Sequence, residues 1–203
     1  MNKRFRMGRT KWAILCSGWG NNVIDVVNAY SNSKVYKDQF EISVFIYDNA
    51  QCGAAEVTKN VGIESLLIPR INFQNSVSHQ DKIMNELKKR NIEFIFLMNY
   101  KYLIRQAMLK SFYNRIINVH PSLFPSFLAT TSAIQDALAY GVKITGITTH
   151  IIDDQYDRGI ILFQVPIKVK DKDTFDTLYP KFKKKGCKII LKTMKAISKK
   201  IEN

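Results

Sequence analysis

Two side chains that could carry out chemistry, Asn118 and His120, stand at the end of an apolar run, Arg115–Val119, and just before the prolines Pro121 and Pro125. A side-chain amide can donate a hydrogen bond to an oxygen that gains negative charge. An imidazole, with an ordinary pKa of roughly 6.5, can give and take protons near neutral pH. Because ligands of open α/β sheets bind beyond the carboxyl ends of strands, we expect Asn118 and His120 at the rim of a cleft.

A carboxylate that could assist this imidazole, Asp157, lies downstream in the segment Gly146–Ile161. There an alternating Thr/Ile strand runs into an acidic loop, and a second apolar strand begins after a glycine. A carboxylate beside an imidazole orients the ring and favours its charged form. Simpler explanations stay open, because His120 could be a capped strand end and Asp157 an ordinary turn residue. His150 shares a strand face with Thr148, so we interpret it as a supporting residue.

A glycine turn follows the first predicted strand, Lys11–Ser17. The turn reads Gly18-Trp19-Gly20-Asn21-Asn22 and leads into a helix over residues 23–30. Strand, glycine turn and helix together direct backbone N–H groups at an anion. A tight turn that needs glycine dihedrals would produce the same pattern, so the motif alone leaves both explanations open.

The motifs N-x-H-P-S-L-x-P and T-x-H-x-x-x-x-x-x-D-x-G-x-I, in this order, resemble those of the formyltransferase superfamily that uses N10-formyltetrahydrofolate. The resemblance extends from Trp12 to about Leu191. It implies that Asn118, His120 and Asp157 are catalytic. Asn118 would donate to the oxyanion of a tetrahedral intermediate, while His120, held by Asp157, moves protons. The resemblance implies neither a metal nor a covalent enzyme intermediate.

The same resemblance implies two groups of ligand-binding residues. The glycine turn would bind the phosphate of an acceptor through Ser17, Gly18, Trp19, Gly20, Asn21 and Asn22. Trp19 and Asn21 replace the small residues usual in the family, so a ring of the acceptor could stack on the indole. The cosubstrate, N10-formyltetrahydrofolate, would contact Tyr100, Leu103, Ile104, Ile152 and Asp153.

Alternating strand and helix patterns predict an α/β fold, with an open, mainly parallel twisted sheet and helices on both faces. This agrees with the Rossmann-like fold that the resemblance implies. The predicted strands include Phe40–Tyr47, Glu64–Ile68, Glu93–Met98 and Ile160–Val169, and the predicted helices include Cys52–Val61, Ser78–Arg90 and Ala133–Tyr140. We expect Pro166 to break the last strand, and we expect His79, at the polar start of its helix, to be solvated.

We interpret residues 1–203 as a single formyltransferase catalytic domain with a basic N-terminal extension, residues 1–10, and a basic C-terminal helix, residues 174–203. A hydrophobic content of 46% suits one sizeable core. The net charge of +14 favours anionic partners. No apolar run approaches the roughly 20 residues of a membrane span. The widely spaced Cys16, Cys52 and Cys187 lack zinc-site spacing, so we expect reduced thiols and a soluble, cytoplasmic protein without a metal.

One helix of the sequence bears on the identity of the acceptor. The helix that in glycinamide ribonucleotide transformylase carries a Glu-His pair has Gly186 and Cys187 at the corresponding positions. This favours a primary amine on a sugar phosphate or a nucleotide-linked amino sugar. The alternatives are phosphoribosylglycinamide and, for a formyltetrahydrofolate hydrolase, water. The chain ends at Asn203 without the extra domain of transfer-RNA-directed relatives, so we expect no nucleic-acid partner. The sequence leaves a homodimer open.

Overall fold

The computed structural model describes residues 8–154 and 157–202, so most of the predicted N-terminal extension lies outside the described residues. The elements follow one another mostly as strand and helix in turn. They are β1 (Thr10–Cys16), α1 (Asn21–Ser31), α2 (Lys34–Gln39), β2 (Phe40–Tyr47), α3 (Ala54–Asn60), β3 (Glu64–Leu67), the 3-10 turn η1 (Arg70–Asn72), α4 (Ser76–Lys89), β4 (Phe94–Leu97), α5 (Gln106–Ser111), β5 (Ile116–His120), α6 (Ala133–Tyr140), β6 (Ile144–Ile151), β7 (Ile161–Lys168) and α7 (Phe175–Glu202).

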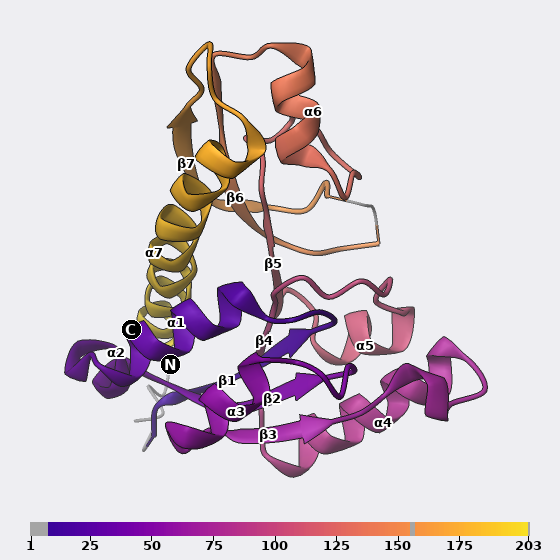
Figure 1. Cartoon of the computed structure of the whole chain (residues 1–203). Helices are drawn as coiled ribbons and strands as arrows, with labels where there is room; N and C mark the ends of the chain where they lie inside the picture. Colours follow the sequence, from indigo (N-terminus) through magenta and orange to yellow (C-terminus); the bar gives the residue numbers. More distant parts are fainter. Residues whose placement is uncertain (1–7, 155–156, 203) are drawn as a thin grey trace, which may run out of the picture.

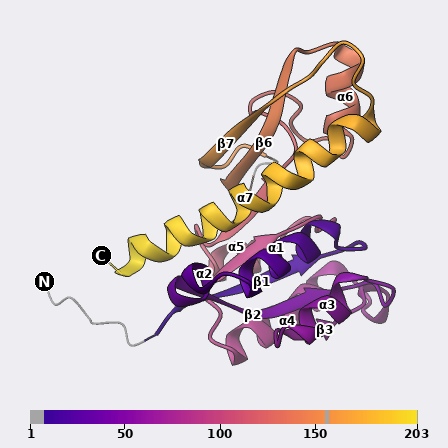
Figure 2. The same cartoon turned by 60° about the vertical axis from the view of Figure 1, so that its left-hand side comes forward.

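The strands form one open sheet of seven strands in the order β3-β2-β1-β4-β5-β6-β7. β1 to β5 pair in parallel, whereas β6 and β7 are added antiparallel at one edge. The predicted open, mainly parallel sheet is confirmed. Figure 1 shows β6, β7 and α6 extending away from the parallel strands, with the long helix α7 running alongside both parts. Figure 2 shows α7 crossing from α6 to the region of α1 and α2.

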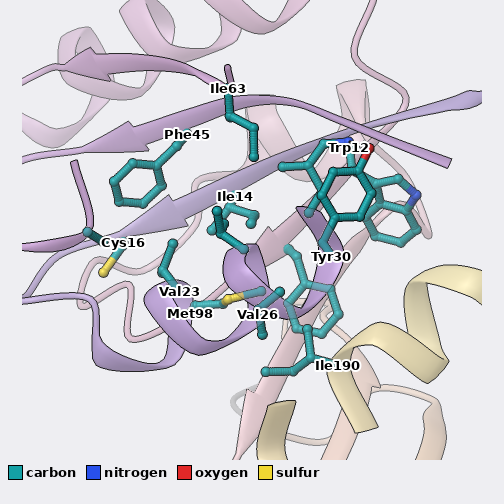
Figure 3. Close-up of a cluster of buried hydrophobic side chains, with 14 of the residues drawn as sticks. Trp12, Ile14, Cys16, Val23, Val26, Tyr30, Phe45, Ile63, Met98 and Ile190 are labelled. Carbon is teal, nitrogen blue, oxygen red and sulfur yellow. Dashed lines mark hydrogen bonds between the residues drawn. The ribbon is translucent and has the colours of Figure 1, made fainter. Parts of the chain in front are cut away.

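Alternating side chains of the central strand β1 enter two separate cores, which places helices on both faces of the sheet. Trp12, Ile14 and Cys16 pack with residues of α1, α3 and α7. Figure 3 shows this cluster, with Ile190 of α7 meeting side chains of α1. Ala13 and Leu15 pack on the other face, with residues of α4 and α5. Helices on both faces are therefore confirmed, and the inner strands β1 and β4 are buried on both faces.

The prediction of a broken last strand is wrong. β7 runs without interruption from Ile161 to Lys168, and Pro166 pairs with Gly146 of β6. β7 is the last strand of the sheet, and an edge strand tolerates proline because one side of it needs no partner. The short helices α2 and α5 are additional elements that the apolar patterns did not indicate.

The prediction of a solvated His79 is also wrong, because its side chain is only 1% exposed. Its Nε2 lies 3.0 Å from the carbonyl oxygen of Ile68, and since a carbonyl only accepts, Nε2 carries the proton. The ring also contacts the rings of Phe73 and Tyr102, at centroid distances of 5.2 and 5.5 Å. The His79 side chain thus packs inward, although the first turn of α4 has a mostly polar sequence.

Burial lowers the pKa of His79, and it also lowers the pKa of the fully buried His150. In the unfolded chain both histidines titrate near their ordinary pKa of about 6.5. The unfolded chain therefore binds protons more readily, so stability is unaffected well above about pH 6.5 and falls as the pH drops below it.

We predict that the free energy of unfolding, measured with urea, is lower at about pH 5.5 than at about pH 7.5. His79→Gln should reduce this difference, because glutamine can still donate to the Ile68 carbonyl but does not titrate. Lys88→Gln, at an exposed position of the same helix, is the control. An equal pH dependence in His79→Gln and the wild type would contradict the prediction.

Candidate active site

The structure brings together the three side chains predicted to be catalytic and adds His150 to them. Nδ1 of His120 lies 3.4 Å from Oδ2 of Asp157. Nε2 of His150 lies 3.3 Å from Nδ2 of Asn118 and 3.5 Å from Oδ1 of Asp157. Asn118 and His120 belong to β5, and His150 pairs with Asn118 across the antiparallel contact of β5 with β6. Residues remote in sequence therefore converge where β5 ends.

The environment of His150 favours its neutral form, because desolvation is the main cause of its lowered pKa. A neutral ring fits both of its hydrogen bonds. Nε2 can accept from the amide of Asn118, and Nδ1 can donate to the carbonyl oxygen of Ile151 at 3.2 Å. The sequence interpretation of His150 as a supporting residue agrees with this position, because the ring contacts the Asn118 amide and lies near Oδ1 of Asp157, whereas His120 lies near Oδ2.

A loop after β5 contacts the same residues through its backbone. The amide N–H of Ala129 donates to Oδ2 of Asp157 at 2.9 Å. The carbonyl oxygen of Phe127 lies 2.9 Å from Nε2 of His120 and accepts from it. Phe127 and Ala129 both have φ of 55°, and Asp157 has φ of 52°. Three non-glycine residues thus adopt the left-handed region, which is uncommon and tends to occur where the surrounding structure enforces it.

Buried polar contacts fix the first part of this loop. The hydroxyl of Thr148 donates to the carbonyl oxygen of Ser122 at 2.7 Å and accepts from the amide of Phe124 at 3.1 Å. The side-chain amide of Gln164 donates to the carbonyl oxygen of Phe124 at 3.1 Å. The Phe124 ring contacts both His120 and His150, at centroid distances of 5.3 and 4.9 Å. The H-P-S-L-F-P segment is therefore anchored to β6 and β7.

A cavity of about 320 Å³ lies beside β5. Val119 and Pro121 line it, whereas the side chains of Asn118 and His120 alternate with them along the chain and point to the other side of the strand. Its other lining residues come mainly from the glycine turn, the start of α6 and α7, and they include Asn21, Asn22, Asn99, Thr131, Gln135, Phe175, Tyr179, Lys183 and Gly186. Two ligands could thus approach the end of β5 from opposite faces of the sheet.

The glycine turn contributes Trp19, Gly20, Asn21 and Asn22 to this cavity. The indole of Trp19 is 59% exposed and lies over Gly53, where a Cβ would come within 2.5 Å of the ring. α1 begins at Asn21 and has no acidic residue in its first turn. Ser17 and Gly18 lie behind the turn instead, against Asn99: the Ser17 amide donates to its carbonyl oxygen, and a Cβ at Gly18 would meet its side chain.

The residues predicted to bind the folate lie at the ends of β4 and β6. Leu103 is 48% exposed, Ile104 is buried, and Ile152 packs on the same core cluster, so these apolar groups suit the flat ring of a pterin. Asp153 is exposed on the loop that leads towards Asp157. Tyr100 packs on this cluster too, but its hydroxyl is buried and burial raises its pKa.

Two negative findings apply to residues 8–154 and 157–202. In these ranges the acidic, histidine and cysteine side chains form no group of three or more that could hold a metal ion. No helix in the same ranges has both the length and the apolar character of a membrane span.

Comparisons with known proteins agree on the family. The sequence profile described as "Formyl transferase" matches residues 10–194. Phosphoribosylglycinamide formyltransferase of Bacillus subtilis is 29% identical over 170 residues, which cover 83% of this chain and 84% of the relative. The chloroplastic enzyme of the same name from Vigna unguiculata is 29% identical, and the match covers 84% of this chain and only 55% of the longer relative. Glycinamide ribonucleotide transformylase 1 from Symbiobacterium toebii has a similar structure, with a TM-score of 0.88 and 25% identity over 98% of this chain and 92% of that one.

The backbone passes so close to Gly159 that a side chain would not fit. A Cβ there would lie 1.8 Å from the carbonyl oxygen of Ile151, so Gly159→Ala must displace the turn that carries Asp157. We predict a loss of roughly 1–3 kcal/mol of unfolding free energy, measured with urea.

Gly186→Ala is the matched control, because its Cβ would meet only Ile147 at an ordinary 3.7 Å. Within helix α7 this substitution should be neutral or stabilise by about 0.5–1 kcal/mol. A Gly159→Ala variant as stable as the wild type would contradict the close packing described above.

Proposed function

Since the chain belongs to the formyl transferase family and is a folate-dependent formyltransferase, we propose that it transfers the formyl group of N10-formyltetrahydrofolate to the primary amine of phosphoribosylglycinamide. The observation that carries this proposal is the convergence of Asn118, His120 and Asp157 at the end of β5, next to a cavity on the other face of the strand. The amine would approach from the cavity and the formyl donor from the side of Asn118.

The formyl donor and the acceptor would bind on opposite faces of β5. Apolar groups at Leu103, Ile104 and Ile152 would hold the pterin. The start of α1, with its free N–H groups, would bind the acceptor phosphate at the other end of the cavity. This arrangement would leave the amine near Val119 and Pro121, where it can reach the formyl carbon.

The side chains at the end of β5 suit the charges that develop during the transfer. When the amine attacks the formyl carbon, negative charge gathers on the formyl oxygen, to which the Asn118 amide would donate. His120 would exchange protons with the nitrogen and oxygen atoms of the intermediate, while Asp157 orients its ring. For this, Nε2 of His120 has to exchange the Phe127 carbonyl for a substrate atom.

We choose the acceptor that the names of the relatives give. Sequence alone favoured a nucleotide-linked amino sugar, because Gly186 and Cys187 stand where a Glu-His pair would be expected. The names of the relatives favour the alternative, phosphoribosylglycinamide. Other side chains that line the cavity, such as Thr131 and Gln135, would supply polar contacts to the ribose instead of the missing carboxylate.

We predict that the protein converts N10-formyltetrahydrofolate and phosphoribosylglycinamide to formylated product, and that His120→Ala and Asp157→Asn lower kcat by about 100-fold or more. Asp81→Asn, at an exposed position of α4, should retain full activity. Steady-state kinetics with liquid-chromatographic detection of the formylated product measures the activity of the wild type and the kcat of each variant.

Two other outcomes would replace this proposal. Turnover with a nucleotide-linked amino sugar and none with phosphoribosylglycinamide would restore the amino-sugar assignment. Release of formate at full rate without any amine would indicate a formyltetrahydrofolate hydrolase.

A further inference from the structure

Three polar side chains with buried oxygen atoms lie at the carboxyl ends of neighbouring strands. Ser17 follows β1, Asp48 follows β2, and Tyr100 lies shortly after β4, with β1 between the other two strands in the sheet. Among the described residues, the hydroxyls of Ser17 and Tyr100 and both carboxylate oxygens of Asp48 have no hydrogen-bond partner. Because buried polar atoms without a partner are rare in folded proteins, this set of oxygens requires an explanation.

The strand register places Ser17 beside Asp48. β1 and β2 pair in parallel up to Cys16 and Tyr47, so Ser17 and Asp48 are the next residues of two adjacent strands. Side chains alternate along a strand, and the residues two positions earlier belong to the core that α4 and α5 cover. Tyr100 packs on the same core. The three side chains therefore lie on one face of the sheet.

The charge of Asp48 is buried without a close counter-ion. Its side chain is 5% exposed, and its only ion pair among the described residues is with Lys101, whose Nζ lies 4.0 Å away and whose side chain is 63% exposed. At this distance the ammonium makes no hydrogen bond, and water screens its charge. Burial and then the charge of Asp48 raise the pKa of Tyr100, as expected for a nearby hydroxyl. A buried water would satisfy the hydrogen bonds of these oxygens, but it would not compensate the charge.

We propose that Ser17, Asp48 and Tyr100 bind a monovalent cation of the size of Na⁺ or K⁺. Carboxylate and hydroxyl oxygens are the ligands that hard cations prefer. One carboxylate balances one positive charge, whereas a divalent ion would leave a net positive charge buried. This proposal departs from the expectation of a protein without a metal, which rested on the spacing of zinc sites. The cation joins the end of β2 to the segment that carries Tyr100.

The test measures the thermal midpoint of the whole chain while K⁺, Na⁺ or NH₄⁺ replaces tetramethylammonium at constant ionic strength and constant chloride. At least one small cation should raise the midpoint of the wild type along a saturating curve, by roughly 3–10 °C at about 10–100 times its Kd. Neither the folate nor the acceptor is present, so the result does not depend on the proposed function. Equal midpoints in all three small cations and in tetramethylammonium would overturn the proposal.

Charge variants locate the site. Asp48→Asn keeps the size of the side chain and removes its charge, so it should abolish the rise of the midpoint with the cation. Asp38→Asn, at an exposed position of α2, is the control and should keep this rise. Lys101→Met removes a like charge near the site, so it should lower the cation concentration at half-saturation. A rise in Asp48→Asn equal to that in Asp38→Asn would overturn the proposal.

Hydroxyl variants decide the question if Asp48→Asn does not fold. Ser17→Ala and Tyr100→Phe each remove one oxygen from the proposed site and keep the carboxylate. Both should therefore need a higher cation concentration for half-saturation than the wild type. Half-saturation at the wild-type concentration in both variants would contradict the assignment of these hydroxyls as ligands and overturn the proposal.

Discussion

The carboxylate of Asp157, placed between two imidazoles, is the contact on which the rest of the site depends. Oδ2 faces His120 at 3.4 Å, and Oδ1 faces His150 at 3.5 Å. The Asp157 side chain is only 12% exposed, so water screens these contacts weakly. His150 in turn contacts the amide of Asn118. A displacement of Asp157 would therefore disturb the positions of all the side chains proposed to act on the formyl carbon.

The fold secures this carboxylate with features that have no chemical role of their own. β6 and β7 join the parallel strands antiparallel, which brings His150 opposite Asn118 and leads the chain back across the end of β5. Gly159 allows the returning backbone to pass against Ile151, and the Ala129 amide holds Oδ2 of Asp157. The proposed division between a donor side and an acceptor side then follows from the alternation of side chains along one strand.

Local patterns in the sequence were enough to predict the parallel strands and the helix from Ala133 to Tyr140. The resemblance to a known family, added to these patterns, singled out Asn118, His120 and Asp157, which the structure brings together. Continuous apolar runs indicate buried strands, and Gly141, at φ of 75°, ends its helix as expected. The two wrong predictions, for Pro166 and His79, have a common cause. Each depends on the parts of the fold that pack against the residue, which the local sequence does not show. Pro166 is tolerated owing to its place in an edge strand, and His79 is buried because the loop of Phe73 covers it.

We propose that donor and acceptor meet at the end of β5 from opposite faces of the sheet. A crystal structure with phosphoribosylglycinamide and a folate analogue whose formyl group cannot be transferred would show where each ligand binds. We expect the formyl oxygen within hydrogen-bonding distance of Nδ2 of Asn118, the Asp157 carboxylate in contact with His120, and the amine of the acceptor next to Pro121 in the cavity beside β5. A formyl group bound away from Asn118 and His120, or an acceptor bound outside that cavity, would contradict it.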